Sequence, residues 1–192
     1  PLYSSAASDV YKRQVMDSAA FPSLSHIDVA KRLNEKFGLT VLIDNDLHVA
    51  TNVARKYSNY QEGITVLYAY GKRKSGSGII ANGEVLCGAS GAAGEVENIP
   101  LHTSDIESER IAFCSERLQT IIALMNPGRV VIYELDEGMD TDKLIGLIKS
   151  KMKPYLLPEF KLGRDFFEDC FLGLSIVCEV GIKQSLRERL NF

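Results

Sequence analysis

Residues 76–95, which read GSGIIANGEVLCGASGAAGE, constrain the fold more than any other part of the chain. The apolar residues 79–80 lead into Asn82 and Gly83, and a short run at 84–86 follows. Asn-Gly between apolar runs is the strongest short-range signal for a β-hairpin, because both central residues of a type I′ turn need a positive φ. The sequence therefore predicts a hairpin with a tight turn at Asn82-Gly83.

The segment after the hairpin, from Gly88 to Gly94, is almost entirely Gly and Ala and leads to the carboxylate of Glu95. A backbone with so little side chain allows the close approach of a ligand or of another structural element. Two interpretations of the residues stay open. The segment either presents Glu95 to a ligand, or it is a packed crossing of small residues after a tight hairpin.

The composition is that of a globular protein. The chain has 192 residues, of which 45% are hydrophobic, so it can bury a core as one or two units. A net charge of -3 does not provide the basic surface that typically binds nucleic acid. No run of about 18 apolar residues occurs, and we expect no membrane span. The four cysteines form no C-x-x-C pair, which is typical of reduced thiols in a cytoplasmic protein.

Strands and helices alternate along the chain, which predicts an α/β layer fold. We expect helices at about 27–37, 46–57, 105–125, 140–153 and 168–189, and strands at about 40–43, 64–70, 79–86 and 129–133. Ser104 and Glu107 form an S-x-x-E capping box that predicts the start of the third helix. The first 14 residues have neither a clear period nor the apolar segment of a signal peptide. We expect residues 1–14 to be a disordered or artefactual leader.

Two motifs resemble the signature of the ROK family (repressors, open reading frames and sugar kinases). The family pattern runs roughly G-G-G-I-I-x-N-G-x-L-x-x-G-x-x-G-x-A-G-E-x-G-H, and residues 78–95 follow it in register. Upstream, Asp44-Asn45-Asp46 comes after the apolar run 41–43 and resembles the family's strand that ends in Asn-Asp. The resemblance covers roughly residues 27–192.

The resemblance implies an actin-like, ribonuclease-H-like α/β fold, of which residues 15–192 would form the C-terminal lobe. In the family, the N-terminal lobe holds a first phosphate-binding hairpin with an Asp-Gly-Gly-Thr type motif. This sequence contains no such motif. We therefore expect a C-terminal part of the fold that lacks most of the N-terminal lobe.

The resemblance also implies a sugar site. In ROK sugar kinases the Asp that matches Asp46 is the general base that takes a proton from a sugar hydroxyl. The Asn before it, here Asn45, also binds sugar, and Glu95 matches a sugar-binding glutamate. A carboxylate suits this chemistry because it accepts a hydrogen bond and then the proton. From the residues alone, Asp46 could instead cap a helix, a role worth about 1 kcal/mol, and the two roles can coexist.

The sequence departs from the family at the zinc site. After Glu95 the expected Gly-His is replaced by Glu97-Asn98. That His is a zinc ligand in the family, and its partners come from a C-x-C-G-x-x-G-C motif that this chain lacks. His102 lies nearby, but one His with the distant Cys114 does not make a four-ligand site. We expect zinc to be absent and the sugar loop to be looser.

A second departure concerns phosphate binding. Where the family has Gly-Thr-Gly-x-Gly, whose backbone amides hold nucleotide phosphates, residues 71–76 read GKRKSG. Lys72, Arg73 and Lys74 are possible anion contacts by charge, but not in the same backbone nest. The alternative is a solvated basic turn. The sequence identifies no partner for His48, which we expect to be structural or exposed.

These observations leave three hypotheses about function. The first is a sugar-sensing domain of a ROK-type transcriptional regulator without catalysis, with a small carbohydrate effector at Asn45, Asp46 and Glu95. It needs no cofactor, and DNA would be bound only by a domain not present in this chain. The second is an ATP-dependent sugar kinase with Asp46 as general base, which needs ATP and magnesium. The third is a dimerisation unit that binds neither. Because the family commonly dimerises, we expect a homodimer. From the cysteine pattern we expect it to be cytoplasmic.

Overall fold

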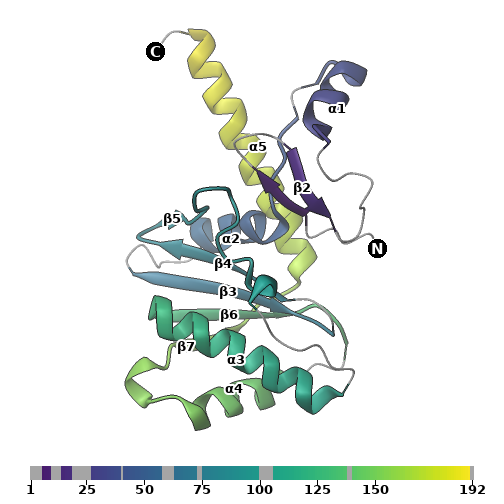
Figure 1. The fold of residues 1–192 in the computed structure, drawn as a ribbon. Coiled ribbons are helices and arrows are strands. Elements are labelled where there is room, and N and C mark those ends of the chain that lie inside the picture. The colour runs from purple at the N-terminus through teal and green to yellow at the C-terminus, as the bar shows by residue number, and fades with distance from the viewer. Residues whose placement is uncertain are drawn as a thin grey trace.

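The computed structural model describes residues 6–9, 14–18, 27–39, 41–57, 63–72, 75–99, 106–137 and 140–190. Its centre is a mixed sheet with the strand order β5-β4-β3-β6-β7 (Figure 1). These strands are β3 (Ile64–Tyr70), β4 (Ser75–Ala81), β5 (Glu84–Val85), β6 (Arg129–Glu134) and β7 (Glu159–Leu162). β3 pairs antiparallel with β4 and parallel with β6, and β6 is parallel to β7.

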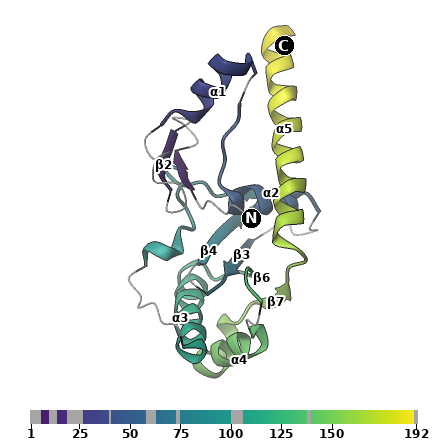
Figure 2. The ribbon, with the colours of Figure 1, turned by 90° about the vertical axis from the view of Figure 1, so that its right-hand side faces the viewer.

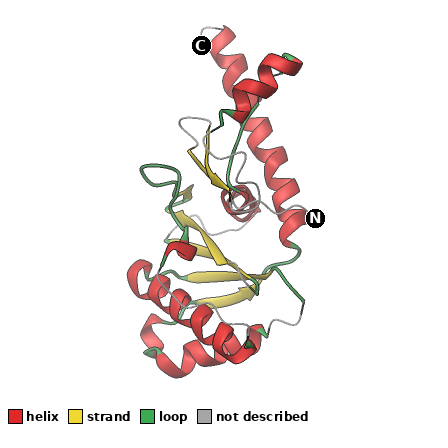
Figure 3. Ribbon diagram, turned by 45° about the vertical axis from the view of Figure 1, so that its right-hand side comes forward, coloured by secondary structure: helices red, strands yellow, loops and turns green. Residues whose placement is uncertain are grey.

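Helices cover both faces of this sheet, as Figures 1 and 3 show. The helices are α2 (Asp46–Tyr57) and α5 (Phe166–Leu190) on one face, and α3 (Glu107–Met125) and α4 (Thr141–Lys151) on the other. Side chains of β3 alternate between the two faces, so Val66 and Tyr68 join the α3/α4 core, while Leu67 and Ala69 join the α2/α5 core. The sheet is therefore buried on both sides, as expected for a layered α/β fold.

One end of the molecule extends beyond the sheet. α5 is 25 residues long, and its C-terminal part projects away from the other helices (Figures 1 and 2). The same end holds α1 (Val29–Phe37) and a small antiparallel sheet of β1 (Ala6–Asp9) and β2 (Gln14–Ser18). Within the described part of the chain, every helix is too short or too polar to span a bilayer.

Several predicted elements have the bounds that the sequence indicated. α2 and β3 begin and end at the predicted residues, and β4 and β5 form the predicted hairpin. The turn residues Asn82 and Gly83 have φ values of 51° and 80°, as a type I′ turn requires.

Other predictions were wrong. The apolar run 41–43 forms no strand, because no described strand pairs with it and a strand needs a ladder partner. The sequence also missed β7 and the short helical turns η2 (Val96–Asn98) and η3 (Pro154–Leu156). α3 begins at Glu107 without a side-chain cap, and Ser104 lies outside the described residues.

Both ends of the chain differ in detail from the prediction. α5 begins at Phe166, two residues before the predicted start, and Asp165 Oδ1 accepts hydrogen bonds from the amides of Phe167 (2.8 Å) and Glu168 (3.0 Å). β1 lies within the expected leader, residues 1–14, most of which are not described. The assignment of a leader stays a prediction.

Candidate functional site

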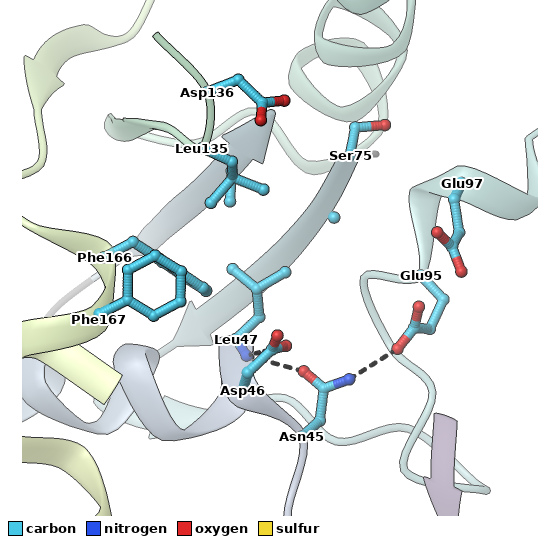
Figure 4. A pocket seen from close by; sticks show the side chains of 12 residues that line it. Asn45, Asp46, Leu47, Ser75, Glu95, Glu97, Leu135, Asp136, Phe166 and Phe167 are labelled. Carbon is cyan, nitrogen blue, oxygen red and sulfur yellow. Dashed lines mark hydrogen bonds between the residues drawn. The ribbon is translucent and has the colours of Figure 1, made fainter. Parts of the chain in front are cut away.

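A pocket lies at the edge of the sheet where β3 and β6 end and β4 begins (Figure 4). Open α/β sheets bind ligands outside the carboxyl ends of their strands. The volume of about 120 Å³ leaves room for several waters or a small polar ligand, since one water needs about 10–15 Å³. The lining residues are Asn45, Asp46, Leu47, Ala69, Ser75, Gly76, Glu95, Glu97, Leu135, Asp136, Phe166 and Phe167.

Asn45 links the start of α2 to Glu95. Its Oδ1 accepts hydrogen bonds from the backbone amides of Leu47 (2.8 Å) and His48 (3.4 Å), which makes it the N-cap of α2. Its Nδ2 donates a hydrogen bond to Glu95 Oε1 at 2.9 Å (Figure 4). The cap of this helix is therefore Asn45, not Asp46, and the same amide reaches across to the glycine-rich segment.

Asp46 is the first residue of α2 and lines the same pocket. The carboxylate is half-buried, and its Oδ1 accepts a hydrogen bond from the amide of Leu47 at 2.8 Å. A negative charge in the first turn of a helix is stabilised by the unpaired amides there. The sequence placed Asp46 directly after a strand, but the residues before it are irregular. The start of the helix, not a strand, therefore gives Asp46 its position.

The glycine-rich segment, residues 88–94, places Glu95 opposite α2. The Gly94 carbonyl accepts hydrogen bonds from the Ser77 amide and the Ser77 hydroxyl, both at 2.9 Å, so the segment is fixed to β4. Gly94 has a φ of 92°, and a Cβ there would overlap the carbonyl oxygen of Ser77. Only glycine allows this approach. Asn45, Asp46 and Glu95 thus lie around one pocket, although their role in sugar binding stays a prediction.

Burial and neighbouring carboxylates raise the pKa of Glu95. Burial has the largest effect, followed by the charges of Glu97 and Asp46, while His48 and the hydrogen bond from Asn45 act in the opposite direction. The ionised pocket therefore holds carboxylates that repel one another. Hydroxyl donors of a ligand would relieve this repulsion, because each can donate to a carboxylate oxygen.

His48 has partners that the sequence did not identify. Its side chain is buried, with 3% of the residue exposed, rather than exposed. Nδ1 lies 3.4 Å from Asp44 Oδ1, and Nε2 lies 3.4 Å from the carbonyl oxygen of Ala93. The hydrogen bond and charge of Asp44 raise the pKa of His48, and burial opposes this shift.

The turn that replaces the family's phosphate loop is partly described. Lys72 is exposed, and Arg73 and Lys74 lie outside the described residues, so an anion contact there stays a prediction. The backbone amide of Lys72 donates a hydrogen bond to Asp136 Oδ2 at 2.6 Å. A Cβ on Gly71 would overlap the same carboxylate. The start of this loop is therefore closed by a side chain of the protein itself.

Sequence reasoning missed several lining residues. Asp136 and Leu135 follow the predicted strand 129–133, a position from which a ligand contact could have been expected. No local signal marks Phe166 or Phe167, which contribute an apolar wall (Figure 4). Among the described residues, no cluster of three or more His, Cys, Asp or Glu is arranged to hold a metal ion. His102 lies outside that set, and the absence of zinc stays a prediction.

Solved structures of similar shape identify the fold class. A ROK hexokinase from Thermus thermophilus matches with a TM-score of 0.71 and 14% identity, over 93% of this chain and 78% of that chain. A ROK glucokinase from Streptomyces griseus, in complex with glucose and AMPPNP, matches with a TM-score of 0.68 and 12% identity, over 88% and 77%. The fold is thus the actin-like ATPase fold, and the predicted fold class is confirmed.

A regulator of the same family is also similar. This ROK family transcriptional regulator, a homologue of the E. coli MLC protein, matches with a TM-score of 0.59 and 13% identity, over 81% of this chain and 55% of that chain. The ROK family model matches residues 9–117, more than half of the chain. The protein belongs to the ROK family. The comparison with curated proteins gave no match.

Proposed function

We propose that this chain is the sugar-binding part of a ROK-type transcriptional regulator and transfers no phosphate. The observation that carries the proposal is the 2.9 Å hydrogen bond from Asn45 to Glu95, beside Asp46 in one pocket. An amide with two carboxylates can donate to and accept from neighbouring hydroxyls. The apolar side chains of Leu47 and Phe166 in the same pocket suit the C–H face of a sugar ring. The ligand would be a small carbohydrate, with no zinc or other cofactor.

The closed loop at Lys72 supports binding without phosphoryl transfer. In the family pattern this loop offers free backbone amides to the nucleotide phosphates. Here the amide of Lys72 is already bonded to Asp136, at 2.6 Å. A phosphate at this position would have to displace a carboxylate and overcome its charge. A domain that only senses a sugar has no need of this loop.

An ATP-dependent sugar kinase is the second candidate. Its support is that Asp46 lines the pocket, where a sugar hydroxyl could reach the carboxylate. The hexokinase and glucokinase structures also match with higher TM-scores than the regulator does, 0.71 and 0.68 against 0.59. Under this alternative, Asp46 takes the hydroxyl proton while magnesium and ATP supply the phosphoryl group.

A calorimetric titration with neutral hexoses and N-acetylhexosamines tests the proposal. We expect saturable binding of at least one sugar, weakened about tenfold or more by Glu95→Ala, because one lost charged hydrogen bond costs about 1.5–3 kcal/mol. Glu116→Ala is the matched control, since Glu116 is exposed on α3 and does not line the pocket. Equal losses for both variants, or no binding of any sugar, would contradict a sugar site at Glu95.

A further inference from the structure

We propose that His48 is a positioning residue: a charged imidazole that ties the start of α2 to the glycine-rich segment and so holds Asn45 against Glu95. His48 makes these contacts in the ligand-free protein. This positioning role rests on the proposed function only where it predicts an effect of His48 on ligand affinity.

The geometry places His48 between the two segments that carry the pair. Asp44, whose Oδ1 is 3.4 Å from Nδ1, directly precedes Asn45. Ala93, whose carbonyl oxygen is 3.4 Å from Nε2, lies two residues before Glu95. The ring therefore contacts both the backbone of Ala93 in the glycine-rich segment and the side chain of Asp44 just before α2. Asn45 and Glu95 meet at 2.9 Å next to this connection.

The chemistry of the partners favours the doubly protonated ring. A carboxylate and a carbonyl oxygen are both acceptors, so a neutral imidazole would turn one lone pair towards an acceptor. Nδ1 is buried, and its contact with Asp44 Oδ1 at 3.4 Å is longer than a typical N–H···O hydrogen bond, so the positive charge of the ring strengthens the contact. Burial of the charged ring is costly, and the attraction of its positive charge to the carboxylate of Asp44 offsets that cost.

The groups that act on the ring set the direction of its pH dependence. The carboxylates of Asp44 and Glu95 and the carbonyl of Ala93 raise the pKa of His48, while burial lowers it. The Cys87 thiol also faces Asp44, which contributes to raising the pKa of Cys87. A histidine pKa raised in the folded state stabilises the fold fully below about pH 6.5, and this contribution disappears as pH rises through the folded pKa. The contact of His48 with Asp44 and Ala93 should therefore weaken as pH rises above the folded pKa of His48.

Two variants separate this role from simple packing. His48→Gln keeps a donor for Ala93 but cannot titrate, and His48→Leu keeps the volume but has no donor. The chain has three histidines, so the ring resonance that disappears in His48→Gln identifies His48 in NMR spectra. Hydrogen exchange of residues 88–95, referenced to β3, measures how firmly the segment is held.

In the wild type we expect the His48 ring to titrate above about pH 6.5, and the protection of residues 88–95 to fall in the same range. His48→Gln should flatten this pH profile, and His48→Leu should lose about tenfold or more of the protection at every pH. A ring that is neutral at about pH 6, or full protection in His48→Leu, would overturn the proposal.

Ligand binding provides a separate readout. For any sugar that binds, we expect the affinity to fall several-fold from about pH 6 to about pH 8.5 in the wild type and to change little in His48→Gln. The same fall in both proteins would overturn the role of His48 in the site. If no sugar binds while ring titration and exchange behave as stated, the proposed function fails and the positioning role is supported.

Discussion

At the scale of single residues, Asn45 performs two tasks with one amide group. Its oxygen caps α2, and its nitrogen holds Glu95. A cap needs an acceptor and the contact with Glu95 needs a donor; an asparagine has both, whereas an ionised aspartate has no donor. The local sequence could not distinguish the cap from its neighbour Asp46, because both side chains suit a helix N-terminus.

Asn45→Asp should separate the two tasks. The new carboxylate still caps α2 but faces Glu95 without a donor, so we expect lower stability than the wild type at neutral pH. The difference should narrow on acidification, as one of the two carboxylates takes up a proton. Urea denaturation at about pH 7 and about pH 5 measures this. Asn45→Ala, which also loses the cap at a cost of about 1 kcal/mol, is the comparison. Equal stability of Asn45→Asp and wild type would show that the contact is unimportant.

Glu95→Gln should stabilise the ligand-free protein at neutral pH. Burial and the charges of Glu97 and Asp46 raise the pKa of Glu95, so its ionised form costs stability above that pKa. The cost declines as pH falls from the folded pKa towards the ordinary value of 4.5, and the variant should then lose its advantage. The amide oxygen of the introduced glutamine can still accept a hydrogen bond from Asn45. Thermal unfolding at about pH 7 and about pH 4 checks the sign, and a lower Tm at neutral pH would contradict it.

At the scale of elements, the sequence correctly predicts those helices, strands and turns that depend on residues close together in the chain. α2, β3 and the turn at Asn82-Gly83 depend on apolar periodicity and on a positive φ within a few residues. The apolar run 41–43 has a similar local pattern, but it pairs with no described strand. Strand formation depends on a partner that a local pattern does not reveal.

The contacts that build the pocket are long-range, and the sequence predicted them only in part. Resemblance to a family brought Asn45, Asp46 and Glu95 into one site. The bond from Lys72 to Asp136 joins residues 64 positions apart, and no pattern near either residue indicates it. The contact of His48 with Ala93 spans 45 positions and was missed for the same reason.

Two helical glycines provide a matched test of the packing of α5 on α2. A Cβ on Gly173 would overlap the carbonyl of Val49 in α2, whereas nothing lies within 4 Å of a Cβ on Gly146 in α4. We expect Gly173→Ala to destabilise by about 1–3 kcal/mol or more through overpacking. Gly146→Ala should stabilise by about 0.5–1 kcal/mol. Urea denaturation measures both, and similar effects of the two variants would mean that α5 does not lie this close to α2.

At the scale of the whole molecule, α5 exposes apolar side chains both near its start and in its projecting part. Phe171 is 72% exposed and Ile182 is 61% exposed, and both lie on a helix that extends beyond the sheet. An exposed apolar patch of a few hundred Å² usually marks an interface. We therefore expect the chain to self-associate through this helix.

Sedimentation of wild type, Phe171→Asp and Leu124→Asp tests this expectation. Leu124 is 78% exposed on α3, which makes it a control for adding a charge at an isolated apolar residue. We expect a dimer for the wild type and the control, and a shift towards monomer for Phe171→Asp. A wild type that stays monomeric at micromolar concentration would contradict the expected dimer.

Sugar binding at Asn45, Asp46 and Glu95 without phosphate transfer is the central feature of the function proposed for this ROK protein. The most direct measurement is ADP release in the presence of magnesium, ATP and each sugar that binds, with wild type and Asp46→Asn. We predict no sugar-dependent ADP release from either protein, because Asp136 occupies the amide of Lys72. Robust sugar-dependent turnover that Asp46→Asn abolishes would contradict the proposed function and identify a kinase.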